Sequence, residues 1–88
     1  MKARRFDIAE EPIIVCDGGE GSVTWPKSFF MKNVGASSVY VGGDDLTVAQ
    51  GYEVAPAEGL SIDMAGDALW AVCAEGDTSS ISTIYNGN

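Results

Sequence analysis

Histidine is absent from this 88-residue chain, and its absence limits the chemistry that the chain can perform. Histidine is the side chain that most often transfers protons near neutral pH, and Ser-His-Asp and Cys-His catalysis both require it. A glycosidase needs only two carboxylates, but it also needs a cleft that holds a sugar ring, which a domain of this size rarely encloses. Glycine-rich phosphate-binding motifs and a CxxC pair are also missing. We therefore expect no enzymatic activity, no catalytic residues and no cofactor.

Carboxylates in glycine-rich turns are the remaining candidates for a metal site. Asp44 and Asp45 lie in one such turn, and Asp63 or Asp67 would add oxygen ligands for Ca²⁺ if the strands brought them close. Residues 17–21 (DGGEG) lack the alternating ligands and the terminal glutamate of a calcium-binding hand. Because acids in such loops ordinarily form solvated turns, we predict no metal site.

The two cysteines, Cys16 and Cys73, are too few for a disulfide-stapled secreted scaffold and too far apart for a metal knuckle. Each belongs to an apolar run, 13–16 or 69–74, and free cysteine is among the most buried residue types. We expect two buried thiols on strands. A disulfide stays possible at this point, because adjacent strands can bring distant residues together.

Aromatic side chains offer a different kind of chemistry, namely recognition of a carbohydrate or a protein. Trp25, Tyr40 and Tyr52 are candidate stacking platforms. Trp70 lies in the most apolar segment, and we expect it in the core. Trp25 precedes Pro26 where a strand meets a turn, so it either seals the end of the domain or anchors a partner.

Charge is distributed unevenly along the chain. The 13 acidic and 5 basic residues give a net charge of −8, and Lys2, Arg4 and Arg5 fall within the first five positions. An acidic body repels nucleic acid, and the longest apolar run, 13–16, is too short to cross a membrane. Carboxylates interrupt the segment after the arginines, so a secretory signal is not indicated. We expect neither nucleic acid nor a membrane as a partner.

Short segments of alternating hydrophobicity, separated by turns about 8–12 residues apart, are typical of a sandwich or barrel. We predict an all-β fold: a small antiparallel β-sandwich or barrel-like jelly roll, with an extended N-terminal arm over 1–11 and a single domain over 12–88. A chain of this length has room for one domain only. The expected strands lie near 12–16, 22–25, 28–34, 38–41, 46–48, 52–55, 60–64, 69–74 and 79–85.

Several segments between Lys32 and Tyr85 resemble a module found in virion proteins of tailed bacteriophages. The matching segments are 32–43 (KNVGASSVYVGG), 48–56 (VAQGYEVAP), 60–64 (LSIDM) and 67–72 (DALWAV). The resemblance implies a small β-sandwich that decorates a capsid or forms part of the head, neck or tail. Residues 56–59 are two residues longer than the usual Pro-Gly in this module, and the first 30 residues have no counterpart in it.

Four residues of the resembling segment have a structural role by physical reasoning alone. Asn33 and Gly35 suit a tight turn because both tolerate positive φ, and Gly42 with Gly43 allows the chain to reverse after Val41. We predict these as turn residues.

Together these observations predict a non-enzymatic virion structural protein, most directly a capsid decoration (cement) protein. We expect it to bind the major capsid protein or another virion protein as a homo-oligomer, for example a trimer, on particles assembled in the host cytoplasm. A head–tail connector or a tail or fibre component is the alternative within this class, and a carbohydrate-binding module is the alternative outside it. The predicted interface residues are Lys2, Arg4, Arg5, Phe6, Ile8, Trp25, Phe29 and Phe30.

Overall fold

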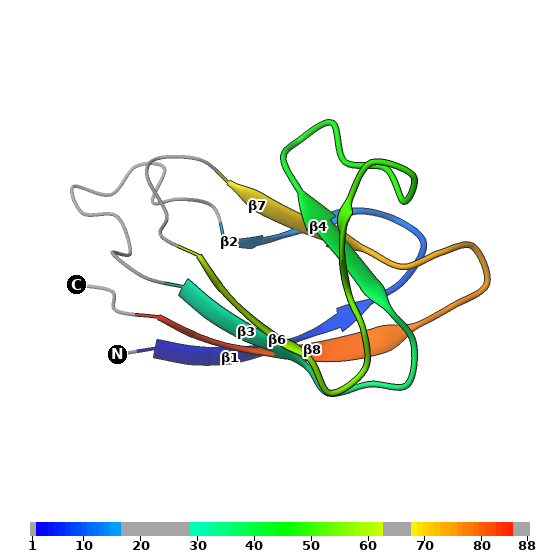
Figure 1. Ribbon diagram of the computed structural model, residues 1–88. Helices are drawn as coiled ribbons and strands as arrows, with labels where there is room; N and C mark the ends of the chain where they lie inside the picture. The colour runs from blue at the N-terminus through cyan, green and yellow to red at the C-terminus, as the bar shows by residue number, and fades with distance from the viewer. Residues whose placement is uncertain (1, 17–28, 63–67, 86–88) are drawn as a thin grey trace.

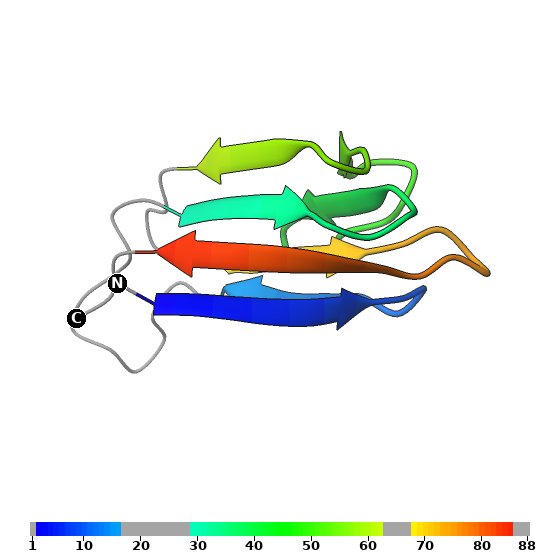
Figure 2. The same ribbon diagram turned by 90° about the horizontal axis from the view of Figure 1, so that it is seen from below.

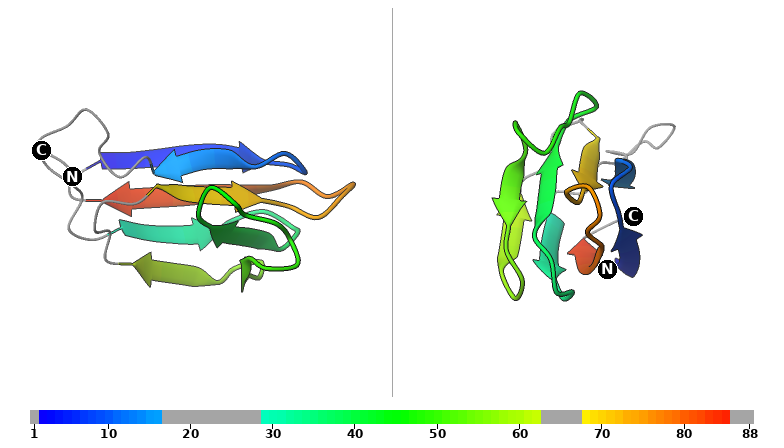
Figure 3. Two further views of the ribbon diagram at one scale, coloured as in Figure 1. Left: turned by 90° about the horizontal axis from the view of Figure 1, so that it is seen from above. Right: turned by 90° about the vertical axis from the view of Figure 1, so that its right-hand side faces the viewer.

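The described residues form two four-stranded antiparallel β-sheets that pack face to face, as the computed structural model shows (Figure 1). The structure describes residues 2–16, 29–62 and 68–85. Sheet A has the strand order β1-β8-β3-β6, and sheet B has the order β2-β7-β4-β5 (Figures 2 and 3). The strands are β1 (Lys2–Ile8), β2 (Ile13–Cys16), β3 (Phe29–Asn33), β4 (Val39–Gly42), β5 (Tyr52–Val54), β6 (Gly59–Ile62), β7 (Leu69–Val72) and β8 (Ser79–Tyr85).

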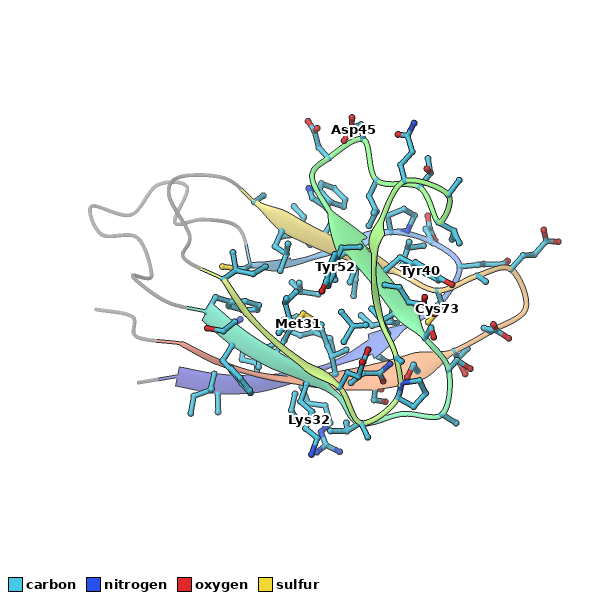
Figure 4. The ribbon with its side chains drawn as sticks, viewed as in Figure 1. Met31, Lys32, Tyr40, Asp45, Tyr52 and Cys73 are labelled. Carbon is cyan, nitrogen blue, oxygen red and sulfur yellow. The ribbon has the colours of Figure 1, made fainter. Side chains whose placement is uncertain are left out.

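The core lies between the two sheets and follows from the alternation of side chains along each strand. In β3, for example, Phe29 and Met31 are fully buried whereas Phe30 is exposed. Figure 4 shows Met31 between the two layers. The other buried apolar side chains of this cluster are Ile8, Val15, Cys16, Val39, Val41, Val54, Leu69, Ala71, Cys73 and Ile81. The prediction of an all-β sandwich is therefore confirmed.

One predicted strand, 46–48, is wrong. This segment belongs to loop 43–51, which consists of two successive turns: the Leu46 amide donates to the Gly43 carbonyl at 3.1 Å, and the Gln50 amide donates to the Thr47 carbonyl at 3.2 Å. A Cβ on Gly51 would stand 2.9 Å from Leu46 Cδ1, so Leu46 packs against its own loop instead of a neighbouring strand. The predicted strand 22–25 lies outside the described residues.

The N-terminal segment also differs from the prediction of an extended arm. β1 pairs with β8 in continuous register, from Lys2 opposite Tyr85 to Ile8 opposite Ser79. The Ile8 side chain is 1% exposed and belongs to the core. Residues 2–8 are therefore an edge strand of sheet A, and the expected boundary between 1–11 and 12–88 does not separate an arm from the sandwich.

Both cysteines are buried, as predicted, and neither forms a disulfide. Cys16 ends β2, whereas Cys73 follows β7, where its Sγ donates a hydrogen bond to the Ile8 carbonyl at 3.6 Å. The Cys73 amide donates to the Ala9 carbonyl at 2.7 Å. Cys73 thus joins the end of β1 to sheet B.

The Cys73 thiol should respond to alkaline pH. Burial raises its pKa above the ordinary value of 9.0, and the Asp77 carboxylate raises this pKa further. Above pH 9.0 the unfolded thiol ionises while the folded thiol keeps its proton, so the free energy of unfolding should fall as the pH rises. Urea unfolding at neutral and alkaline pH should show a larger decrease in the free energy of unfolding for the wild type than for Cys73→Ala. Equal losses in the two chains would contradict this assignment.

Candidate interaction surface

The outer surface of sheet A is a flat face made by side chains that point away from the core. Directly paired residues of neighbouring strands point to the same side of a sheet. The side chains of this face therefore form rows that run across the strands. One row runs Ala3, Ile84, Phe30 and Ser61, and the next runs Arg5, Ser82 and Lys32. We call these seven residues the sheet A face.

The first row is exposed, and three of its four residues, Ala3, Ile84 and Phe30, are apolar. Phe30 and Ile84 lie directly opposite each other on β3 and β8, with 47% and 39% of their surface accessible. The Phe30 ring lies over Gly59 of the edge strand β6: a Cβ at Gly59 would stand 3.1 Å from Phe30 Cζ. Val34, just after β3, is 41% exposed, but Lys32 lies between it and Phe30 along the strand. The adjacent exposed pair of Phe30 and Ile84 is therefore the apolar part of a candidate surface for a partner.

The second row is basic. Arg5 and Lys32 flank Ser82 on either side, and the Arg5 guanidinium donates to Ser82 Oγ at 3.3 Å. Among the described residues neither cation forms an ion pair. The neighbouring carboxylate, Asp7, accepts a hydrogen bond from Ser80 Oγ at 3.1 Å. An apolar row beside two unpaired cations is notable in a chain with a net charge of −8.

The structure distributes the predicted interface residues among different environments. Arg5 and Phe30 lie on the sheet A face, and Arg4 is exposed on β1. Phe6 is half-buried and packs against the core.

Two of the interface predictions need correction. Ile8 and Phe29 are 1% and 0% exposed, because they occupy inward positions of their strands, so neither offers a surface to a partner. Lys2 belongs to β1 by its backbone pairing, whereas Trp25 lies outside the described residues.

Sequence reasoning missed Lys32 and Ile84 as surface residues. The period-two alternation of 29–33 already separates Phe30 and Lys32 from the buried Phe29 and Met31. Ile84 joins them only through the pairing of β8 with β3, and a residue pattern alone does not fix this register.

The predicted turn residue Asn33 is a buried hydrogen-bonding centre. Its side chain is 0% exposed, and its Nδ2 donates to the carbonyls of Ser37 at 2.7 Å and Val54 at 2.9 Å. Its Oδ1 accepts from the Gly35 amide at 3.1 Å and from Ser79 Oγ at 2.7 Å. The amide group therefore fastens the β3–β4 turn to the end of β5 and to the start of β8.

The prediction that the turn residues need positive φ is wrong. Among the described residues positive φ occurs at Ala57 and Gly76, and not at the predicted turn positions. Gly35 is required by close packing instead: a Cβ there would stand 2.5 Å from the Ser80 amide nitrogen and would overlap Ser79 Oγ. Gly42 ends β4 and faces Leu46, and a Cβ on Gly43 would make an ordinary 3.6 Å contact with Asp45 Oδ1.

We expect Gly35→Ala to destabilise the chain by about 1–3 kcal/mol, the usual range for overpacking. The new methyl group would push the start of β8 away from the β3–β4 turn. Gly43→Ala is the matched control, because its Cβ has room, and its midpoint of urea unfolding should stay near that of the wild type. A similar midpoint for Gly35→Ala would show that the turn adapts.

A second surface lies where the β1–β2 turn, loop 43–51 and the turn after β7 meet. It is an open hollow of about 600 Å³ lined by Pro12, Val48, Cys73 and three glutamates, Glu10, Glu11 and Glu75. Glu10 accepts a hydrogen bond from the Gly76 amide at 3.1 Å. We call this open region, with its six lining residues, the acidic hollow. In Figure 4, Lys32 of the sheet A face and Asp45 of loop 43–51 project from opposite sides of the sandwich.

The aromatic candidates do not form a common platform. Tyr40 pairs with Glu53, and Tyr52 pairs with Val41, so the two tyrosines belong to opposite faces of sheet B. Tyr52 is 64% exposed, whereas Tyr40 is half-buried. Trp70, which we expected in the core, is half-buried at the outward position of β7, and its indole N–H has no hydrogen-bond partner among the described residues.

The described residues contain no group of three His, Cys, Asp or Glu side chains that could hold a metal ion. Asp44 and Asp45 are exposed in loop 43–51, whereas Asp63 and Asp67 lie outside the described part of the chain. In that part, no helix has the length and apolar character needed to cross a membrane.

Comparison with protein-family models, with curated proteins and with solved structures finds no match to this chain. The structure itself shows a small all-β sandwich with an exposed sheet face that carries apolar and basic side chains.

Proposed function

We propose that this chain is a non-enzymatic structural protein of a virion, most directly a capsid decoration protein of a tailed phage. It binds the outer shell through an exposed surface and acts as a homo-oligomer. A head–tail connector or a tail component would use the same kind of surface in fewer copies.

The sheet A face is the observation that carries this proposal, because it equips the chain to bind a protein partner, either a shell protein or a second copy of the chain. Phe30 and Ile84 leave 47% and 39% of their surface in water, and burial of such side chains against a partner is favourable by about 25 cal/mol per Å² of apolar surface. The neighbouring Arg5 and Lys32 favour a partner surface that carries carboxylates. The resemblance of segments between Lys32 and Tyr85 to tailed-phage virion modules supports the same class of protein.

The N-terminal residues contribute to this proposal in a different way from a free arm. Because β1 is paired with β8, the Arg5 side chain belongs to the basic row of a rigid sheet. The partner would therefore meet a preformed surface and would not have to order a mobile segment, which lowers the entropic cost of binding.

The composition of purified particles tests the proposal. Quantitative mass spectrometry of virions from the virus that encodes this chain should find it in many copies, in a fixed ratio to the main shell protein. A copy number per particle that corresponds to one ring of subunits would favour the connector alternative. Absence from purified particles would refute the virion role.

A further inference from the structure

The sheet A face and the acidic hollow have complementary properties. The face presents the aromatic ring of Phe30 beside the cations Arg5 and Lys32. The lining of the hollow combines the apolar Pro12 and Val48 with three glutamates. Both surfaces therefore offer apolar contact, and each carries the charge opposite to that of the other.

The charges on both surfaces are available to a partner. Among the described residues, Arg5 and Lys32 have no ion pair, and Glu11 and Glu75 are exposed without an internal hydrogen bond. Opposite charges on two protein surfaces steer their encounter and fix their relative orientation. One chain that carries both surfaces can thus bind its own copies.

We infer that copies of this chain associate head to tail, with the sheet A face of one copy covering the acidic hollow of the next. This inference rests on the proposed function and deepens it, since it assigns the sheet A face to the contact between copies of the homo-oligomer. Within the oligomer, a surface other than this face would then bind the shell. A contact between two different surfaces closes into a ring or continues as an open chain, depending on the rotation between copies.

A symmetric pair of sheet A faces is disfavoured by the same charges. Such a dimer would bring four cations, Arg5 and Lys32 of each copy, into one interface, and like charges in an interface are repulsive.

A charge-swap experiment on the full chain tests the inference. One variant, Arg5→Glu/Lys32→Glu, makes the sheet A face acidic, and a second, Glu11→Lys/Glu75→Lys, makes the hollow basic. Each variant alone carries charges of the same sign on its two surfaces, which repel each other. Its self-association should therefore weaken at least about 100-fold relative to the wild type. An equimolar mixture should associate again, because each reversed surface finds an opposite charge on the other variant.

Sedimentation velocity and light scattering at increasing concentration provide the readout, and circular dichroism with thermal unfolding checks that both variants are folded. Phe30→Ser in the otherwise unchanged chain should weaken association without a change in net charge. If a variant does not fold, the milder substitutions Lys32→Gln on the face and Glu75→Gln in the hollow replace it, and the self-association of each is compared with that of the wild type.

Three results would overturn the inference: a wild-type chain that stays monomeric at all concentrations, a face variant that associates like the wild type, or a mixture that does not recover. These outcomes are independent of the virion role. A chain found in particles but monomeric in solution would refute this contact alone, whereas a self-associating chain absent from particles would refute the proposed function alone.

Discussion

Asn33→Ala should destabilise the chain by about 3–5 kcal/mol, because a buried polar group left without its partner costs about 1–3 kcal/mol. The substitution removes four hydrogen bonds at once, two donated by Nδ2 and two accepted by Oδ1. It leaves the carbonyls of Ser37 and Val54 without this donor. A small domain is stable by only about 5–15 kcal/mol, so this loss should be visible in the midpoint of urea unfolding.

Graded variants separate the hydrogen-bond network from a general loss of packing. Ser79→Ala removes only the bond between Ser79 Oγ and Asn33 Oδ1, which is 2.7 Å long and buried, and should cost about 1–2 kcal/mol. Ser38→Ala removes an exposed bond of similar length, 2.8 Å to Glu53, and should change stability by less than about 0.5 kcal/mol. If Asn33→Ala were as mild as Ser38→Ala, Asn33 would not hold the turn in the way we describe.

Asn33 also shows how far the sequence predicts the fold. Its type and its place before Gly35 indicate a turn, and the alternating strands around it indicate a sandwich, both of which the structure contains. The distant partners could not be read from the chain. Ser79 lies 46 positions away, and its approach depends on the pairing of β8 with β3.

Loop 43–51 shows why local periodicity can mislead. Leu46 and Val48 alternate with polar residues as a strand would, but a two-residue alternation is too short to distinguish a strand from consecutive turns. The structure favours turns because Leu46 packs against Gly42 and Gly51 of the same segment.

The candidate interaction surface was predicted only in part, for a related reason. Once one buried residue of a strand is known, the alternation of side chains tells which of its residues point outward. In β3 this rule places Phe30 and Lys32 on the outward side. The neighbours of these residues on the face depend on strand order and register, which place Ile84, Ser82 and Arg5 beside them. The sequence contains no local signal for the pairing between the first and the last strand.

That pairing leads to the prediction with the largest effect, which concerns deletion of residues 1–8. If these residues formed an arm, the deletion would leave the fold intact. Because they form β1, the deletion removes the buried Ile8 side chain, the packing of Phe6 and the whole pairing with β8. Loss of a buried isoleucine alone costs about 2–5 kcal/mol, so the shortened chain should fail to fold or should melt far below the wild type.

Two variants separate the strand from its charges. Ile8→Ala keeps β1 and should still cost about 2–5 kcal/mol through the cavity it creates. Arg4→Ser/Arg5→Ser keeps the core side chains and should change the free energy of unfolding by less than about 1 kcal/mol, since both arginines are exposed. Circular dichroism and thermal unfolding measure all three chains. A deletion variant that melts cooperatively at the wild-type temperature would show that the sandwich is complete without β1, and the first residues would again be available as an arm for binding.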